Sequence, residues 1–213
     1  MRLAAFIALA SALLTASARG HTPTSHPAEE TAEESKLSFS LSANVYFVPH
    51  ERTYVQPTIQ INYDWLRLEA RYNYEDLETT SAWAGVNFSF GKELTLDFTP
   101  MLGVVCGNTQ GIAPGFELTV AWHKFELYSE AEYLFDTSDS SNNFIYTWTE
   151  LTWSPLDWLY GGVVFQRTRA YETDLDIQHG LVVGVTFEHL GLAAYLMDPE
   201  NDPFVILGAS LEF

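Results

Sequence analysis

Apolar and polar residues alternate along most of the chain that follows residue 36. In residues 37–48, apolar side chains fall on one face, while Ser, Asn and Tyr side chains fall on the other. A period of two is typical of a β-strand whose two faces have different surroundings. The pattern recurs with turn residues between the runs. It predicts strands over residues 37–48, 54–64, 65–75, 81–90, 93–105, 112–122, 125–136, 144–153, 158–170, 177–188, 190–197 and 204–213.

The connections between these strands alternate in length. Short links lie at residues 64–65, 91–92, 123–124, 154–157 and 189, and longer polar links at residues 49–53, 75–80, 106–111, 136–143, 171–176 and 198–203. An even number of antiparallel strands with short turns and longer loops in alternation is typical of an outer-membrane barrel. The sequence therefore predicts an all-β fold, a transmembrane up-and-down antiparallel β-barrel of twelve strands, with ten as the fallback. We expect both termini in the periplasm.

Aromatic residues gather at both ends of the predicted strands. Those next to the short links are Tyr63, Trp65, Phe88, Phe90, Trp122, Phe125, Trp153, Trp158 and Phe187. Those beside the longer links are Phe47, Tyr54, Tyr72, Tyr74, Phe135, Phe144, Tyr146 and Tyr171. Membrane barrels carry a girdle of aromatic residues at each membrane–water interface. A general preference of aromatic residues for strands does not explain why they gather at strand ends.

The last strand carries the most specific motif of the chain. It alternates back from Phe213 through Leu211, Ala209 and Leu207. A final Phe on such a strand resembles the signal by which the barrel-assembly machinery inserts bacterial outer-membrane proteins. The resemblance covers residues 37–213 as a pattern, and its specific motif is confined to the last ten residues. It implies that this machinery is a partner during insertion.

The first 36 residues differ from the rest. Arg2 precedes a short apolar run, and Ala16, Ser17 and Ala18 are small residues of the kind at which a signal peptidase cleaves. The run is shorter than the about 20 residues that a membrane-spanning helix needs. We therefore predict a signal peptide at residues 1–18 and, from its polar composition, a disordered periplasmic leader at residues 19–36. Residues 37–213 form the barrel, which we expect in the outer membrane after export.

Charge and composition narrow the partners. The formal net charge of -18, with a pI of about 4.4, argues against nucleic acid. Cys106 is the single cysteine, so an intramolecular disulfide cannot form. A soluble barrel would have to pack its apolar face inside, and twelve strands enclose a lumen too wide for the aliphatic side chains present. We therefore expect the apolar face to contact outer-membrane lipids and lipopolysaccharide.

The alternate face then lines the lumen. Pairing across the turn at residues 123–124 brings Glu117 opposite Glu130. Carboxylates this close bind cations, pair with arginine or hold a proton. A ring of acids attracts cations and repels anions. We predict as pore-lining residues Arg67, Glu69, Arg71, Asp97, Glu117, Glu126, Glu130, Glu132 and Glu150, with Arg167 or Arg169 near the outer mouth.

Such a lumen is compatible with two functions. The first hypothesis is a narrow porin for passive diffusion of small hydrophilic solutes, preferably cations. The second is a non-conducting barrel, filled by Glu–Arg pairs, that serves structure, envelope integrity or adhesion. Small porins for acidic sugars resemble the chain in length and strand number, but their lumen is basic, which argues against an anionic sugar here. No loop looks long enough to fold inward as in trimeric porins, so we expect a monomer.

An outer-membrane hydrolase is the least favoured reading. His179 is the nearest candidate for the lipid-facing Ser-His-Asn set of outer-membrane phospholipase A, but no serine follows two residues on. Asp174, Asp176 and His179 resemble the acidic and histidine residues of omptin proteases, whose motif and ten-strand pattern are absent. We predict no catalytic, cofactor-binding or metal-binding residues. The acidic segment at residues 198–202 leaves weak divalent bridging to lipopolysaccharide open, beside a purely solvating role.

Overall fold

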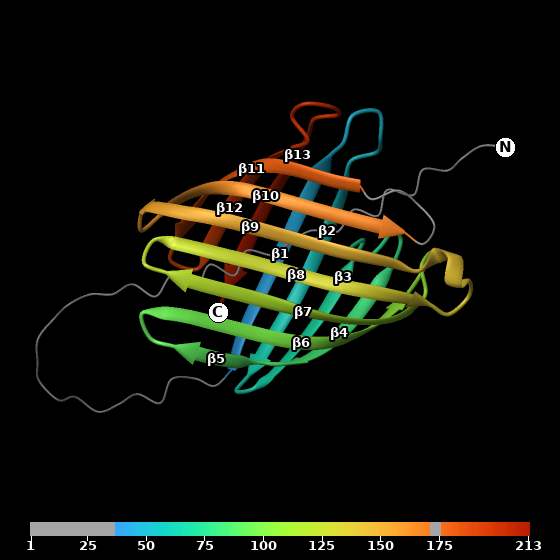
Figure 1. Cartoon of the computed structure of the whole chain (residues 1–213), viewed down its shortest axis with the longest axis horizontal. Helices are drawn as coiled ribbons and strands as arrows, with labels where there is room; N and C mark the ends of the chain where they lie inside the picture. The colour runs from blue at the N-terminus through green and yellow to red at the C-terminus, as the bar shows by residue number, and fades with distance from the viewer. Residues whose placement is uncertain (1–36, 171–175) are drawn as a thin grey trace, which may run out of the picture.

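The described residues, 37–170 and 176–213 of a computed structural model, form one antiparallel β-barrel (Figure 1). A short 3-10 turn, Ser140–Asn142, lies between two of the strands. None of these residues forms a helix long and apolar enough to cross a membrane. The strands are β1 (Leu37–Phe47), β2 (Tyr54–Tyr63), β3 (Leu66–Tyr72), β4 (Thr80–Val86), β5 (Phe88–Gly91), β6 (Leu94–Cys106), β7 (Gly111–Trp122), β8 (Phe125–Asp136), β9 (Phe144–Leu156), β10 (Leu159–Ala170), β11 (Asp176–Phe187), β12 (Leu190–Met197) and β13 (Phe204–Glu212).

The barrel has twelve strands, because β4 and β5 are two parts of one strand. They flank Asn87 and both pair with β6. Each strand pairs with its neighbours in the chain, and β1 pairs with β13 to close the barrel. At this closure, the Phe39 N–H donates to the Phe213 carbonyl at 3.0 Å, and the Phe213 N–H donates to the Phe39 carbonyl at 2.8 Å. Closure leaves no unpaired sheet edge. The predicted all-β, twelve-strand, up-and-down barrel is confirmed.

Apolar side chains cover the outside of the barrel, and the inside contains polar side chains together with buried aromatic and aliphatic ones. On β2, Ile59 is 51 % exposed, whereas the adjacent Gln60 is 2 % exposed. A water-soluble barrel has the opposite arrangement, because apolar burial drives its folding. The alternation of the strand pattern is satisfied when lipid surrounds the apolar face and the polar face lines a lumen.

The aromatic belt at the turn end agrees with the sequence. In Figure 1 the β7–β8 and β9–β10 turns lie at the left end of the barrel, and the loop with the 3-10 turn lies at the right. All nine aromatic residues predicted beside the short links are exposed on the outer face. Here the prediction of an outward aromatic belt is confirmed.

The aromatic belt predicted at the loop end is partly wrong. Tyr74, Phe144 and Tyr146 are buried inside the barrel. Tyr146 and Phe144 occupy inward positions of β9, and Tyr74 follows Asn73, whose φ of 55° turns the chain inward. A count of aromatic residues near strand ends does not distinguish the two faces. Phe47, Tyr72 and Phe135 are exposed as expected, Tyr54 is half-buried, and Tyr171 lies outside the described residues.

Two further expectations are corrected. Strand β9 extends to Leu156, so the turn to β10 is shorter than the predicted link at residues 154–157. Pro155 is tolerated there because the Ser154 N–H already bonds the β8 side at the Lys124 carbonyl, and on the β10 side the register is irregular between Leu159 and Gly161. Arg167 is exposed on the outer face, in register with Ile177, and does not line the lumen. The predicted signal peptide and leader at residues 1–36 lie outside the described residues.

Candidate functional site: the acidic lumen

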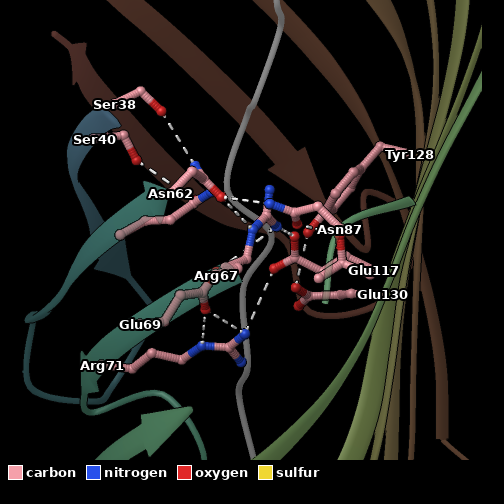
Figure 2. A network of polar contacts seen from close by, with 12 residues as sticks. Ser38, Ser40, Asn62, Arg67, Glu69, Arg71, Asn87, Glu117, Tyr128 and Glu130 are labelled. Atoms are coloured by element: carbon pink, nitrogen blue, oxygen red, sulfur yellow. Dashed lines mark hydrogen bonds and ion pairs between the residues drawn. The ribbon is translucent and has the colours of Figure 1, made fainter. Parts of the chain in front are cut away.

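Strand β3 presents three charged residues to the lumen at alternate positions: Arg67, Glu69 and Arg71. Figure 2 shows the arginine side chains extending from β3 toward Glu117 and Glu130. Because the inner face of a strand contains every second residue, the segment Arg-Leu-Glu-Ala-Arg places both arginines and the intervening glutamate inside. Glu69 and Arg71 are each 4 % exposed.

The facing part of the wall is acidic. Glu117 on β7 pairs in register with Glu130 on β8, which confirms the predicted pairing across the turn at residues 123–124. Glu132 follows on the same face of β8. All three side chains are buried, and Glu150 on the neighbouring β9 is buried as well. Four carboxylates therefore share one region of the inner wall.

The two arginines bridge this acidic region to β3. Arg67 Nη1 donates to Glu117 Oε2. Arg71 Nη2 lies 2.7 Å from Glu69 Oε2 and 3.6 Å from Glu117 Oε1, and Arg71 Nη1 lies 3.5 Å from Glu132 Oε2. In the sheet, β4 and β6 separate β3 from β7. These ion pairs therefore cross the lumen and do not follow neighbouring strands.

Aromatic rings complete the surroundings of Arg71. Its guanidinium carbon lies 4.3 Å from the centre of the Tyr74 ring and 4.7 Å from that of Trp83. Cation–π contacts of this kind are worth about 0.5–2 kcal/mol, depending on solvent exposure. Gly103, the register partner of Trp83, leaves room for the indole, because a Cβ there would lie 2.5 Å from it. The sequence search for charged lumen residues did not identify these aromatic partners.

Two side chains of the β3–β4 connection point into the lumen. Tyr74 and Glu75 are each 1 % exposed. The Tyr74 hydroxyl donates to Glu130, and Trp83 Nε1 donates to Glu75 Oε1 at 3.1 Å. The sequence predicted an external loop here. The polar composition of a loop does not show whether its side chains point outward or into the lumen. Side chains of a short loop thus reach the lumen, whereas the expectation that no loop is long enough to fold inward as in trimeric porins stays a prediction.

Contacts from neighbouring segments hold the inward loop. The Asn73 side chain donates to the Val55 carbonyl at 2.9 Å and accepts from the Glu78 N–H at 2.8 Å. From the β6–β7 loop, the Thr109 hydroxyl donates to Asp76 Oδ2 at 2.9 Å, and Asn108 Nδ2 donates to the Leu77 carbonyl at 2.9 Å. These bonds fix the position of the loop at the loop end of the lumen.

Glu150 connects the acidic region to the other side of the lumen. Its Oε1 accepts from Trp148 Nε1 at 2.7 Å and from the Tyr195 hydroxyl at 3.1 Å. Tyr195 lies on β12, which β10 and β11 separate from β9. We call the inner faces of β3, β7, β8 and β9 the charged wall, and those of β10 to β13 the neutral wall.

The neutral wall contains none of the predicted charged pore-lining residues. Apart from Glu212 at the turn end, the described inward side chains of β10 to β13 are uncharged. The alternation that marks the outer face as apolar does not require the inner face to be polar. The buried members of this wall are Tyr160, Val164, Gln166, Val182, Ala193, Tyr195, Met197, Phe204 and Ile206.

The remaining predicted residues lie away from this region. Asp97 is exposed and Glu126 half-buried, both toward the turn end. The residues of the predicted insertion signal, Leu207, Ala209, Leu211 and Phe213, are exposed on the outer face, and Phe213 is 70 % exposed.

The residues considered for a hydrolase do not form a site within the part of the chain that the structure describes. His179 lies on the outer face of β11, in register with the lipid-facing Phe165. Asp174 and the side chain of Asp176 lie outside the described residues.

Comparison with known proteins gives similarity in fold. A scan against protein-family models gives no match, and a search of curated proteins finds no similar sequence. The KdgM porin has a TM-score of 0.60 at 10% sequence identity, over 83% of this chain and 99% of that one. The KdgM porin in complex with disordered oligogalacturonate gives 0.59 at 10% identity over the same shares. The outer membrane protein Omp33 of Acinetobacter baumannii gives 0.50 at 13% identity, over 84% of this chain and 100% of that one.

These similarities define the class of fold. The chain has the closed antiparallel β-barrel fold of these outer-membrane proteins, as its strand pattern predicted. At 10–13% identity the likeness concerns the backbone arrangement alone.

Proposed function

We propose that the chain is a narrow porin of the outer membrane, through which small hydrophilic solutes diffuse passively and cations pass preferentially. The observation that carries this proposal is the charge of the lumen. Among the described residues, two arginines of the inner wall face a larger number of buried glutamates. These glutamates are Glu69, Glu75, Glu117, Glu130, Glu132 and Glu150.

The excess of carboxylates is large enough to select ions. Two unit charges 4 Å apart interact with about 1 kcal/mol in water and about 4 kcal/mol at an effective dielectric constant of 20. Thermal energy is only about 0.6 kcal/mol, so one uncompensated carboxylate already favours a cation over an anion nearby. Arg67 and Arg71 form ion pairs with Glu69, Glu117 and Glu132. They leave negative charge in excess.

Location and assembly follow from the same proposal. The fold supports residence in the outer membrane, and the exposed side chains of the last strand are available to the barrel-assembly machinery during insertion. We propose a monomer that contacts outer-membrane lipids and lipopolysaccharide with its apolar face. We propose no enzymatic activity, in keeping with the porins whose fold it shares.

A second candidate is a non-conducting barrel for envelope integrity or adhesion. The ion pairs of Arg67 and Arg71 cross the lumen, and the β3–β4 loop places Tyr74 and Glu75 inside it. These contacts narrow the passage and favour this alternative. The porin remains the main proposal because so many buried carboxylates are unfavourable unless cations reach them.

Charge-neutralising variants test the proposal. Replacing Glu126, Glu130 and Glu132 together by Gln removes three acids from the inner face of β8. We expect the cation-to-anion permeability ratio in planar bilayers under a salt gradient to fall by about fivefold or more, which corresponds to about 1 kcal/mol. Glu200→Gln, at an exposed position in the β12–β13 loop, is the control and should leave the ratio unchanged. An unchanged ratio in the triple variant would remove the argument for acidic selectivity.

A further inference from the structure

A small cavity lies beside Arg71 in the lumen. Its volume is ≈ 10 Å³, about the room that one water molecule occupies by this measure. Figure 2 shows Arg71 reaching from β3 toward the side of the lumen from which Glu117 and Glu130 extend. The side chains that matter at the cavity are Arg71, Trp83, Glu117, Glu130, Glu132 and Tyr146.

Glu132 has an unsatisfied oxygen at this cavity. Its Oε2 lies 3.5 Å from Arg71 Nη1, but its Oε1 is buried and has no hydrogen-bond partner. Glu75 has the same character, because its Oε1 accepts from Trp83 whereas its buried Oε2 has no partner. Trp83, which donates to Glu75, borders the cavity together with Glu132. Buried carboxylate oxygens without donors are costly, so a bound donor that carries positive charge would stabilise both.

The surroundings of the cavity already bind one cation. This cation is the guanidinium group of Arg71, which contacts carboxylates and the ring faces of Tyr74 and Trp83. Trp83 and Tyr146 also border the cavity. Aromatic rings stabilise organic cations as well as arginine. The same combination of carboxylate and ring is therefore available to a second, diffusible cation.

We propose that this cavity binds the primary ammonium group of a small organic amine. An N–H of the ammonium group donates to Glu132 Oε1, and the nearby carboxylates of Glu130 and Glu75 stabilise its charge. The rings of Trp83 and Tyr146 contact the group from the side. The site identifies small primary amines as a solute class of the proposed porin, and in this respect the inference rests on the proposed function. Binding itself requires no conduction.

The chemistry of the site favours this class over other cations. The cavity is about the size of a water molecule, which suits an –NH₃⁺ group and excludes a tetramethylammonium ion. A potassium ion has the charge but donates no hydrogen bond to the Glu132 oxygen. A useful probe is therefore methylammonium, with tetramethylammonium and potassium as comparisons at equal ionic strength.

Thermal unfolding of the refolded full-length chain in detergent tests the proposal. A ligand that binds only the folded state raises the unfolding midpoint, and the rise grows with the logarithm of the ligand concentration once this exceeds the dissociation constant. We expect methylammonium chloride to raise the midpoint by about 2–4 °C relative to tetramethylammonium chloride. Potassium chloride should give less than half of this rise. Equal midpoints in methylammonium and potassium would overturn the proposed donor-dependent site.

Matched variants place the effect at this cavity. Glu132→Gln should raise the half-saturating methylammonium concentration at least about tenfold, because a charge-assisted hydrogen bond is replaced by a neutral one. Glu75→Gln, which also carries an unpartnered oxygen, is the second variant should the first fail to fold. Glu126→Gln is the control, since Glu126 lies on the same face of β8 but does not line the cavity. A methylammonium response that both Glu132→Gln and Glu75→Gln retain would overturn the assignment.

The outcome separates this site from the proposed function. A barrel that responds to methylammonium but never conducts in bilayers supports the binding site and contradicts the porin. A barrel that conducts but shows no methylammonium response supports the porin and contradicts the site.

Discussion

The two walls of the lumen obey the same strand pattern but stabilise the barrel differently. On the charged wall, Arg67 and Arg71 join strands that are not neighbours in the sheet through ion pairs with Glu117 and Glu132. On the neutral wall, the described interior consists of uncharged side chains such as Val164 and Ile206. Removing one charge therefore leaves a partner uncompensated, whereas the neutral wall loses only the packing of the group removed.

The two walls also divide the proposed function. In the proposed function, the carboxylates of the charged wall attract cations. The neutral wall contributes an uncharged surface on the opposite side of the lumen. Glu150 and Tyr195 connect the two across the lumen at 3.1 Å. We therefore expect changes on the charged wall to affect both stability and selectivity, and changes on the neutral wall to affect stability alone.

The largest expected effect follows from Arg71→Met. This change keeps an unbranched side chain but leaves Glu69 and Glu132 without their shared cation. Breaking a buried ion pair by removing one partner typically costs about 3–5 kcal/mol. The free energy of unfolding, from urea titration of the folded barrel, should fall by that order. Arg167→Met removes an exposed arginine from the outer face and should stay within about 0.5 kcal/mol of the original chain. Similar losses of unfolding free energy in Arg71→Met and Arg167→Met would contradict the expected difference between the lumen and the outer face.

Tyr195→Phe tests the connection between the walls. The variant removes the hydroxyl that donates to Glu150 and keeps the ring against Trp148, whose centre lies 5.6 Å from that of Tyr195. A hydrogen bond to a charged group contributes about 1.5–3 kcal/mol. We expect a loss of this order in the free energy of unfolding. Tyr63→Phe, in the exposed turn-end belt, provides the control, and an equal loss there would show that the lumen contact is not special.

Two cross-strand pairs of glycine and an aromatic residue sharpen the comparison further. Gly103 pairs with Trp83 on the charged-wall side, and Gly184 pairs with Tyr160 on the neutral wall. A Cβ at Gly103 would meet the fused ring of Trp83 at 2.5 Å, whereas a Cβ at Gly184 would meet the hydroxyl end of Tyr160 at 2.1 Å. The free end of a side chain moves more easily than a hydrogen-bonded indole.

Gly103→Ala should therefore cost more than Gly184→Ala. Overpacking of this kind costs about 1–3 kcal/mol, and we expect Gly103→Ala near the upper and Gly184→Ala near the lower end. The unfolding free energies measure the difference. Gly103→Ala should also alter single-channel conductance, because Trp83 lies beside Arg71, whereas Gly184→Ala should not. The reverse order would mean that Trp83 is not fixed by its bonds to Ser81 and Glu75.

The sequence predicts the backbone well because a strand face is a local property. The alternation in residues 37–48 identifies β1, and the last strand, β13, is its register partner. The outward aromatic belt at the turn end was predictable for the same reason, since each short turn fixes which residues flank it. The pairing of Glu117 with Glu130 also follows from a short turn.

The lumen was less predictable because its contacts join residues distant in the chain. Arg67 meets Glu117 across the lumen, and nothing in the local pattern specifies that partner. The inward turn at Asn73 depends on hydrogen bonds to Val55 and Glu78, so the burial of Tyr74 could not be deduced from strand periodicity. The uncharged character of the neutral wall was not predicted, because alternation identifies an apolar outer face without fixing the polarity of the inner one.

Single-channel recording of the refolded chain in a planar bilayer, with a potassium chloride gradient across it, tests the central claim most directly. The account predicts discrete conductance steps and a reversal potential of the sign set by potassium, because the charged wall carries an excess of carboxylates. A folded barrel that never conducts, or one whose reversal potential follows chloride, would contradict it.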